Sequence, residues 1–207
     1  MADPLPAAFY RRDPVTVAND LLGARLVRRT REGLVDGRIV EVEAYLASTD
    51  PACHTYRGLT PRNRVMFSNG GNLYVYAIHA RYCLNVVTET TGIGSAVLIR
   101  ALEPQRGIPM MQRRRRRDAL LDLTRGPARL CEALDVDRRL DGWDLTQGRS
   151  IWIESASAPA QSIARSPRIG VTAGNKALLR FFLDGSRFVS GPRKWHSARP
   201  AGGSHGE

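Results

Sequence analysis

The segment RIVEVEAY, residues 38–45, limits most strongly what this chain can fold into. Side chains of an extended strand point alternately to its two faces. The pattern therefore predicts a strand with Val40, Val42 and Ala44 on one face. The opposite face would carry two carboxylates, an isoleucine and a tyrosine: Ile39, Glu41, Glu43 and Tyr45. Together with the residues that follow, this grouping of two carboxylates and a tyrosine is interpreted as half of a functional site.

More candidate site residues follow between Gly37 and Leu102. Each lies at the end or on one face of a predicted strand, and they are His54, Tyr74, Tyr76, Asn85 and Arg100. The strands are predicted at residues 72–78, 82–88 and 95–102, after a turn at Asn69-Gly70-Gly71. Their short connections, at residues 79–81 and 91–94, predict an antiparallel meander beside the strand that contains Glu43.

The rest of the chain mixes helices and strands. Asp13-Pro14 has the form of a helix start, with an N-cap followed by proline. Residues 48–67 predict a long ordered loop or a loop with a short helix. Further helices are predicted at 108–117 and 128–134, and strands at 25–29, 34–45, 149–154, 168–172 and 178–183. No repeat or linker divides the chain, so we expect one α+β domain over residues 1–190 and a disordered tail over 191–207.

The charge of the chain points to a polyanionic partner. Its 207 residues carry a formal net charge of +11, almost all from arginine, since the lysines are Lys176 and Lys194 alone. Guanidinium groups bind phosphate oxygens in pairs, so nucleic acid is the leading partner, with an acidic membrane or simple solubility as alternatives. The run Arg113–Arg117 fits a solvated face and a nucleic-acid patch equally well.

The cysteines and the N-terminus predict the compartment. Cys53, Cys83 and Cys131 are odd in number and widely spaced, which is typical of reduced thiols. The first ten residues lack a secretory pattern, and no apolar run approaches the roughly 20 residues of a membrane-spanning helix. We expect an intracellular, cytoplasmic, nucleoid-associated protein that is not secreted.

The residues alone leave several roles open. Glu41 and Glu43 could each be a surface acid paired with a cation or a general base that activates water. Tyr74 and Tyr76 could pack across strands or stack on a nucleobase. The four histidines lack the paired spacing of zinc sites, so we expect no metal and no cofactor.

Five strings in this order resemble the 3-methyladenine (alkyladenine) DNA glycosylase family. They are EVEAY from Glu41, DPACH ending at His54, LTPRNRVMF from Leu59, LYVY from Leu73 and AVLIRALEP from Ala96. Weaker similarity extends over nearly all of the chain except the tail. Several unusual strings in one order are more specific than any single motif.

The resemblance implies a monofunctional enzyme that flips alkylated or deaminated purines out of duplex DNA and hydrolyses the N-glycosidic bond. Glu43 matches the family's catalytic glutamate, and Tyr45, His54 and Tyr76 match its stacking pocket. Asn85 matches a residue beside the pocket that can exclude unwanted bases. The implied fold is a mostly antiparallel curved sheet with flanking helices and a protruding β-hairpin. The protein is expected to act as a monomer.

The resemblance also implies contacts to DNA. Arg100 matches the arginine that holds the phosphate of the flipped nucleotide, and Arg129 and Arg138 match further backbone contacts. The chain departs from the family at the hairpin that enters the minor groove. The family commonly has an aromatic wedge followed by glycine, whereas this chain has His79 and Ala80, followed by Arg81, which could compensate electrostatically. The hairpin is also one residue shorter, which puts the strand face of Asn85 in question.

Two other functions fit parts of the sequence. A catalytically inactive DNA-binding protein on this scaffold would keep the arginines and tolerate the altered hairpin. A general RNA-binding or phosphate-binding protein would explain the charge, but not the combination of Glu43, Tyr45, His54 and Tyr76.

Overall fold

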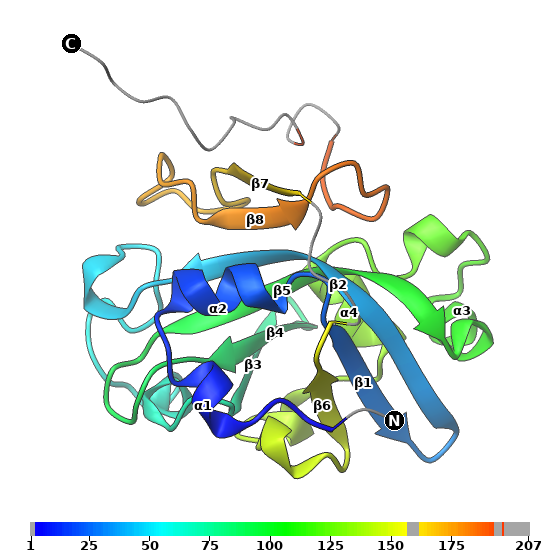
Figure 1. Cartoon of the computed structure of the whole chain (residues 1–207), viewed down its shortest axis with the longest axis horizontal. Helices are drawn as coiled ribbons and strands as arrows, with labels where there is room; N and C mark the ends of the chain where they lie inside the picture. Colours follow the sequence, from blue (N-terminus) through cyan, green and yellow to red (C-terminus); the bar gives the residue numbers. More distant parts are fainter. Residues whose placement is uncertain (1–2, 157–161, 193–195, 197–207) are drawn as a thin grey trace.

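A curved antiparallel sheet forms the centre of the protein (Figure 1). The computed structural model describes residues 3–156, 162–192 and 196. Within these residues the sheet has eight strands in the order β3-β4-β5-β2-β1-β6, and β8 pairs with both β2 and β7. The strands are β1 Arg25–Thr30, β2 Gly33–Tyr45, β3 Leu73–Ile78, β4 Arg81–Val87, β5 Ala96–Arg106, β6 Ile151–Glu154, β7 Ile163–Ser166 and β8 Arg180–Leu183. The predicted α+β fold and its antiparallel meander are confirmed.

Short helices flank the sheet. The Asp13 side chain accepts hydrogen bonds from the backbone N–H groups of Val15 and Thr16, which confirms it as an N-cap. The α-helices are α1 Ala7–Tyr10, α2 Pro14–Leu21, α3 Ile108–Arg115 and α4 Pro127–Ala133. Short 3-10 helices lie at η1 Ala47–Thr49, η2 Arg64–Phe67, η3 Leu120–Asp122, η4 Arg138–Leu140 and η5 Leu145–Gln147. No helix among the residues described is long and apolar enough to cross a membrane.

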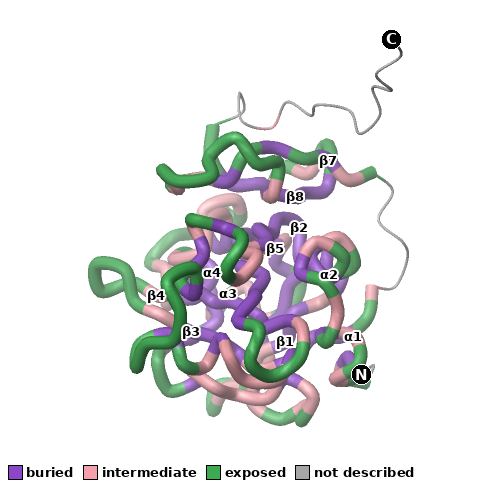
Figure 2. Tube along the Cα trace, turned by 90° about the vertical axis from the view of Figure 1, so that its left-hand side faces the viewer, coloured by how far each residue is buried: buried purple, intermediate pink, exposed green. Residues whose placement is uncertain are grey.

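One face of β2 builds the main core, and the other face is left for the site. Val40, Val42 and Ala44 are fully buried in a cluster that also takes residues from α2 and α4. Figure 2 shows this buried chain along β2 and β5. The prediction for Ile39 was wrong, because it also belongs to this core. A register shift between Ile39 and Glu41 inserts an extra residue into β2, so strict alternation fails there.

The strand predicted at residues 168–172 needs correction, and the predicted tail falls mostly outside the described residues. Residues 168–172 do not form a strand, and β7 ends instead at Ser166. Pro167 has no N–H to donate to a strand ladder, and Gly170 has a φ of 78°, which takes the chain out of extended conformation. The predicted tail, residues 191–207, lies outside the described residues except for Gly191, Pro192 and His196.

Candidate active site

Four strands place side chains of the site on one face of the sheet. Glu43 on β2 pairs with Leu98 on β5, which pairs with Asn85 on β4, which pairs with Tyr74 on β3. Residues directly opposite in antiparallel strands point to the same face. The shortened hairpin therefore leaves Asn85 on the face of Glu43, since its two-residue turn keeps the β3–β4 register regular.

Glu43 lies fully buried at the base of this face. The Tyr45 hydroxyl donates to its Oε2 at 2.9 Å, and the backbone N–H of Ile169 donates to its Oε1 at 2.8 Å. Arg100 Nη1 lies 3.3 Å from Oε2. The pKa of Tyr45 is raised, mainly by burial and next by the negative charge of Glu43. The Tyr45 hydroxyl therefore stays protonated and can donate its hydrogen bond. These contacts hold the carboxylate in one orientation.

Glu41 has a different environment, although it is equally buried. Its Oε1 accepts from Arg180 Nε at 2.6 Å, from Arg100 Nε at 3.2 Å and from Ser190 Oγ at 3.0 Å. Its Oε2 accepts from the backbone N–H of Ser190 at 2.6 Å. Four donors occupy this carboxylate, so Glu41 joins β2, β5, β8 and the following segment and has little capacity left for a ligand.

Arg100 bridges both acids. It lies at the third register shift between β2 and β5, between the pairs Glu41–Ala101 and Val42–Ile99. A bulge of this kind redirects a side chain, and here the guanidinium turns toward both carboxylates. Burial tends to lower its pKa, but the charges of Glu43 and Glu41 outweigh burial and raise it. Its side chain is only 8% exposed, so its contact to a DNA phosphate stays a prediction.

Three aromatic rings form a wall beside Glu43. The rings of His54 and Tyr76 meet edge to face with centroids 4.6 Å apart, and Tyr74 stacks on Tyr76 at 5.3 Å. Tyr74 hydroxyl and His54 Nδ1 share a hydrogen bond of 2.9 Å. Burial, aided by the charge of Arg62, lowers the pKa of His54, so its ring is neutral at neutral pH. A neutral ring can face a cationic purine without charge repulsion.

The cavities beside this wall differ in size. An inner chamber of about 20 Å³, lined in part by Asn85 and Met66, has room for about one water molecule. An outer cleft of about 480 Å³ is within the range of small-molecule sites. Tyr45, His54 and Tyr76 line both spaces, whereas Arg100 and Ile169 line the outer cleft.

Arg168, which the sequence did not indicate as a site residue, forms a clamp behind Tyr45 together with Asp50. The guanidinium carbon of Arg168 lies 4.5 Å from the centroid of the Tyr45 ring. Arg168 also forms two hydrogen bonds to Asp50, at 2.5 and 2.7 Å, and one to the carbonyl of Ala44 at 2.9 Å. The next residue, Ile169, holds Glu43, so one segment positions both the acid and the ring.

Apart from the buried Arg100, the predicted DNA-contacting residues are exposed. His79, Ala80 and Arg81 are exposed at the end of the β3–β4 hairpin, next to Ile78, which is 44% exposed and lines the cleft. The side chains of Arg129 and Arg138 are 45% and 51% exposed. The helix of Arg129 begins at Pro127 on the edge of the cleft.

The described residues contain no cluster of three or more histidine, cysteine, aspartate or glutamate side chains arranged for a metal ion. The cavities and contacts above are instead built from aromatic rings, carboxylates and guanidinium groups.

Comparison with known proteins identifies relatives over almost the whole domain. Residues 8–187 match the sequence model of the family described as Methylpurine-DNA glycosylase (MPG). A protein of Methanoculleus marisnigri is 51% identical over 191 residues, which cover 90% of this chain and 98% of the relative. A protein of Mesorhizobium japonicum is 49% identical over 92% of this chain and 91% of its own length. Both are named, provisionally, as 3-methyladenine DNA glycosylases.

Proposed function

Because the chain belongs to the methylpurine-DNA glycosylase family, we propose that it flips alkylated or deaminated purines out of duplex DNA and hydrolyses their N-glycosidic bond. Its partner would be double-stranded DNA that contains damaged purines. It would act as a monomer in the cytoplasm, on nucleoid DNA. The names of its relatives point to 3-methyladenine as a substrate.

One observation carries the proposal: a buried, firmly oriented carboxylate whose partners line an aromatic cleft. Glu43 is held by Tyr45, Ile169 and Arg100, and all three of these residues line the outer cleft of about 480 Å³. Glu41 is equally buried but is occupied by Arg180, Arg100 and Ser190, whereas the partners of Glu43 lie on the cleft.

The proposed chemistry is a displacement by water at the sugar carbon C1′. Glu43 accepts a proton from the water while the water oxygen bonds to C1′, and the N-glycosidic bond breaks with its electron pair going to the purine. An alkylated purine is cationic and becomes neutral as it leaves, so it needs no added proton. Neutral hypoxanthine needs protonation or hydrogen bonding to leave. The negative charge of Glu43 also favours the oxocarbenium-like sugar in the transition state.

The aromatic wall would offset the cost of base flipping. Unpairing and unstacking a base costs a few kcal/mol, and stacking on aromatic rings returns about 1–3 kcal/mol. The flipped base would enter the outer cleft between Tyr45 and the rings of His54 and Tyr76, because the inner chamber is too small for a purine. Asn85, in the inner chamber, would then exclude unwanted bases. His79 would act as the wedge in the minor groove, with exposed Ile78 beside it.

We also propose that the enzyme does not cleave the DNA strand. Strand-cleaving glycosylases use an amine that forms a Schiff base with the sugar. Lys176 is not among the residues that line the cleft, and Lys194 lies outside the described residues. Water would therefore be the nucleophile.

Release of free base from oligonucleotides tests the proposal. Duplexes that contain 3-methyladenine, 7-methylguanine or hypoxanthine would be incubated with the protein and with Glu43→Gln, which keeps the side-chain size. We expect single-turnover release to fall about 10²–10⁴-fold in the variant. Equal release by both proteins would remove Glu43 from the mechanism, and no release by either would favour an inactive DNA-binding protein.

A further inference from the structure

The structure contains a second basic hollow, far from the cleft. It is an open groove of about 650 Å³. Its lining residues come from β1, the β1–β2 turn, the segment after α4 and the start of β6: Arg28, Arg29, Thr30, Arg31, Glu32, Asp135, Arg139, Arg149 and Ser150. Five arginines thus face two carboxylates. We propose that this arginine groove binds the sugar–phosphate backbone of a second DNA segment.

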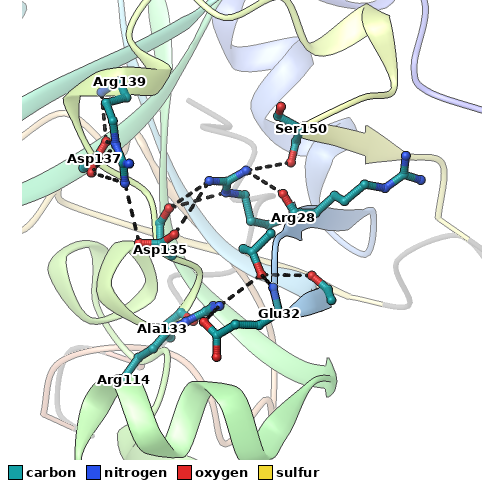
Figure 3. Close-up of polar contacts among 11 residues, drawn as sticks. Arg28, Glu32, Arg114, Ala133, Asp135, Asp137, Arg139 and Ser150 are labelled. Carbon is teal, nitrogen blue, oxygen red and sulfur yellow. Dashed lines mark hydrogen bonds and ion pairs between the residues drawn. The ribbon is translucent and has the colours of Figure 1, made fainter.

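Both carboxylates of the groove are already engaged by arginines (Figure 3). Glu32 forms an ion pair with Arg114, from α3 outside the groove. It forms a second ion pair with Arg113 of the same helix. Asp135 lies within 4.0 Å of both Arg28 and Arg139. Arg113 and Arg114, two residues of the run whose role the sequence left open, therefore neutralise part of the groove's acid.

Three arginines of the groove are left to meet an anion. Arg29, Arg31 and Arg149 are exposed, and none has a carboxylate oxygen within 4.0 Å among the described residues. Deeper in the groove, Arg28 donates to the carbonyls of Ser150, Asp135 and Arg29. Burial is the largest cause that lowers the pKa of Arg28; the charge of Asp135 opposes it, and the charges of Arg114 and Arg139 make smaller contributions that lower the pKa further.

The lining chemistry selects a phosphate backbone rather than bases. Stacking of single-stranded bases needs aromatic rings, and no aromatic residue lines the groove. The neighbouring indole of Trp152 is buried and lies beneath the guanidinium of Arg29, at 5.3 Å. Guanidinium groups that meet only phosphates bind without sequence preference.

Position argues for a second DNA segment rather than the flank of the first. The groove lies at the start of β2 and Glu43 near its end, at opposite sides of the molecule (Figure 1). Ten residues of extended chain separate Gly33 from Glu43, or about 33 Å. Arg28 and Arg29 are neighbours on β1 and therefore point to opposite faces of the sheet, so the groove extends around the end of the β1–β2 hairpin. A duplex shorter than the distance along β2 cannot contact both sites.

The choice of DNA rests on the proposed function, so binding and base release are measured separately. The probe is an undamaged DNA hairpin with a stem of about 8 base pairs, about 27 Å long, which is too short to bridge the two sites. Its stoichiometry would be measured by isothermal titration calorimetry at low salt. The groove variant is Arg31→Ala/Arg149→Ala, and the control is Arg11→Ala/Arg117→Ala, which removes two exposed charges outside the groove.

We expect two hairpins per wild-type and control protein, and one per groove variant. For the second site, the slope of log affinity against log salt should fall by about 1.8 when two phosphate contacts are lost. Release of damaged base from a short duplex should be unchanged in the groove variant. Loss of the second hairpin in a protein without base release would uphold the groove and refute only the proposed function.

Three results would overturn the groove proposal. The first is a single hairpin per wild-type protein, and the second is equal loss in the groove variant and the control. The third is a groove variant that weakens binding of one longer duplex at one-to-one stoichiometry, which would make the groove part of the cleft's own footprint. Unchanged melting temperatures of both variants would show that folding does not account for the losses.

Discussion

Glutamine at position 41 or 43 should separate a structural acid from a catalytic one. Both carboxylates are fully buried on one strand face, but Glu41 accepts four hydrogen bonds and faces the buried guanidinium of Arg180. Glu41→Gln removes the negative charge that compensates this guanidinium. Breaking a buried ion pair costs about 3–5 kcal/mol, and because glutamine keeps one acceptor oxygen we expect the low end, about 3 kcal/mol.

Glu43→Gln should cost less stability. Arg100 keeps its contact with Glu41, and the glutamine oxygen can still accept from Tyr45 or Ile169. The loss is then about one hydrogen bond, or about 1 kcal/mol. For a chain of this size 1 kcal/mol corresponds to about 2–4 °C in melting temperature. The expected decreases are therefore about 6–12 °C for Glu41→Gln and about 2–4 °C for Glu43→Gln.

The assay combines calorimetric melting with single-turnover base release well below both melting temperatures. We expect Glu43→Gln to lose activity about 10²–10⁴-fold while staying folded, and Glu41→Gln to lose stability while keeping most of its activity. The opposite pattern, with an unstable Glu43 variant and an inactive but stable Glu41 variant, would refute the assignment of roles.

Four further outcomes are expected. Ala80 has a φ of 61° in the hairpin turn, so Ala80→Gly should raise the free energy of unfolding by about 0.5–1 kcal/mol in denaturant titrations; a decrease would show that the turn is not strained. His79→Ala should lower excision from duplex DNA more than from single strands, and equal losses would exclude a wedge role. Arg168→Lys cannot keep the paired hydrogen bonds to Asp50, so it should raise KM for damaged duplex several-fold with a smaller change in kcat. An unchanged KM would mean that Arg168 does not position Tyr45. The pKa of His54 is lowered in the folded protein, so the unfolded chain takes up the proton first, and the free energy of unfolding should fall as pH drops through about 6.5. The variant His54→Asn should lack this pH-dependent loss. Identical pH profiles for the two proteins would contradict the prediction.

Much of the fold was predictable because local chemistry agrees with it. Asp13-Pro14 begins a helix, and the alternation around Val42 and the meander after Asn72 form as expected. The errors have local causes as well. Ile39 joined the core because of a bulge, which depends on how β2 meets β5. The strand predicted at residues 168–172 does not form, because β7 ends at Ser166, before Pro167.

Part of the candidate site was likewise predictable from the sequence, and part was not. The sequence and its family resemblance grouped Glu43, Tyr45, His54 and Tyr76. In the structure the three rings line one cleft, and Glu43 accepts a hydrogen bond from Tyr45. The sequence and the resemblance did not reveal the clamp by Arg168, because a contact across more than a hundred residues has no local pattern. The groove at Arg31 was hidden for a similar reason, since its charges come from four separate segments.

The sequence by itself determined that two acids and a tyrosine share one strand face, because alternation is a property of the extended backbone. How each acid is held was decided only by tertiary structure. Arg180 and Ser190, distant in sequence, occupy Glu41, whereas Glu43 is held by Tyr45, Ile169 and Arg100, which line the outer cleft. Burial and hydrogen-bond partners depend on which segments meet in space, and no single strand encodes that.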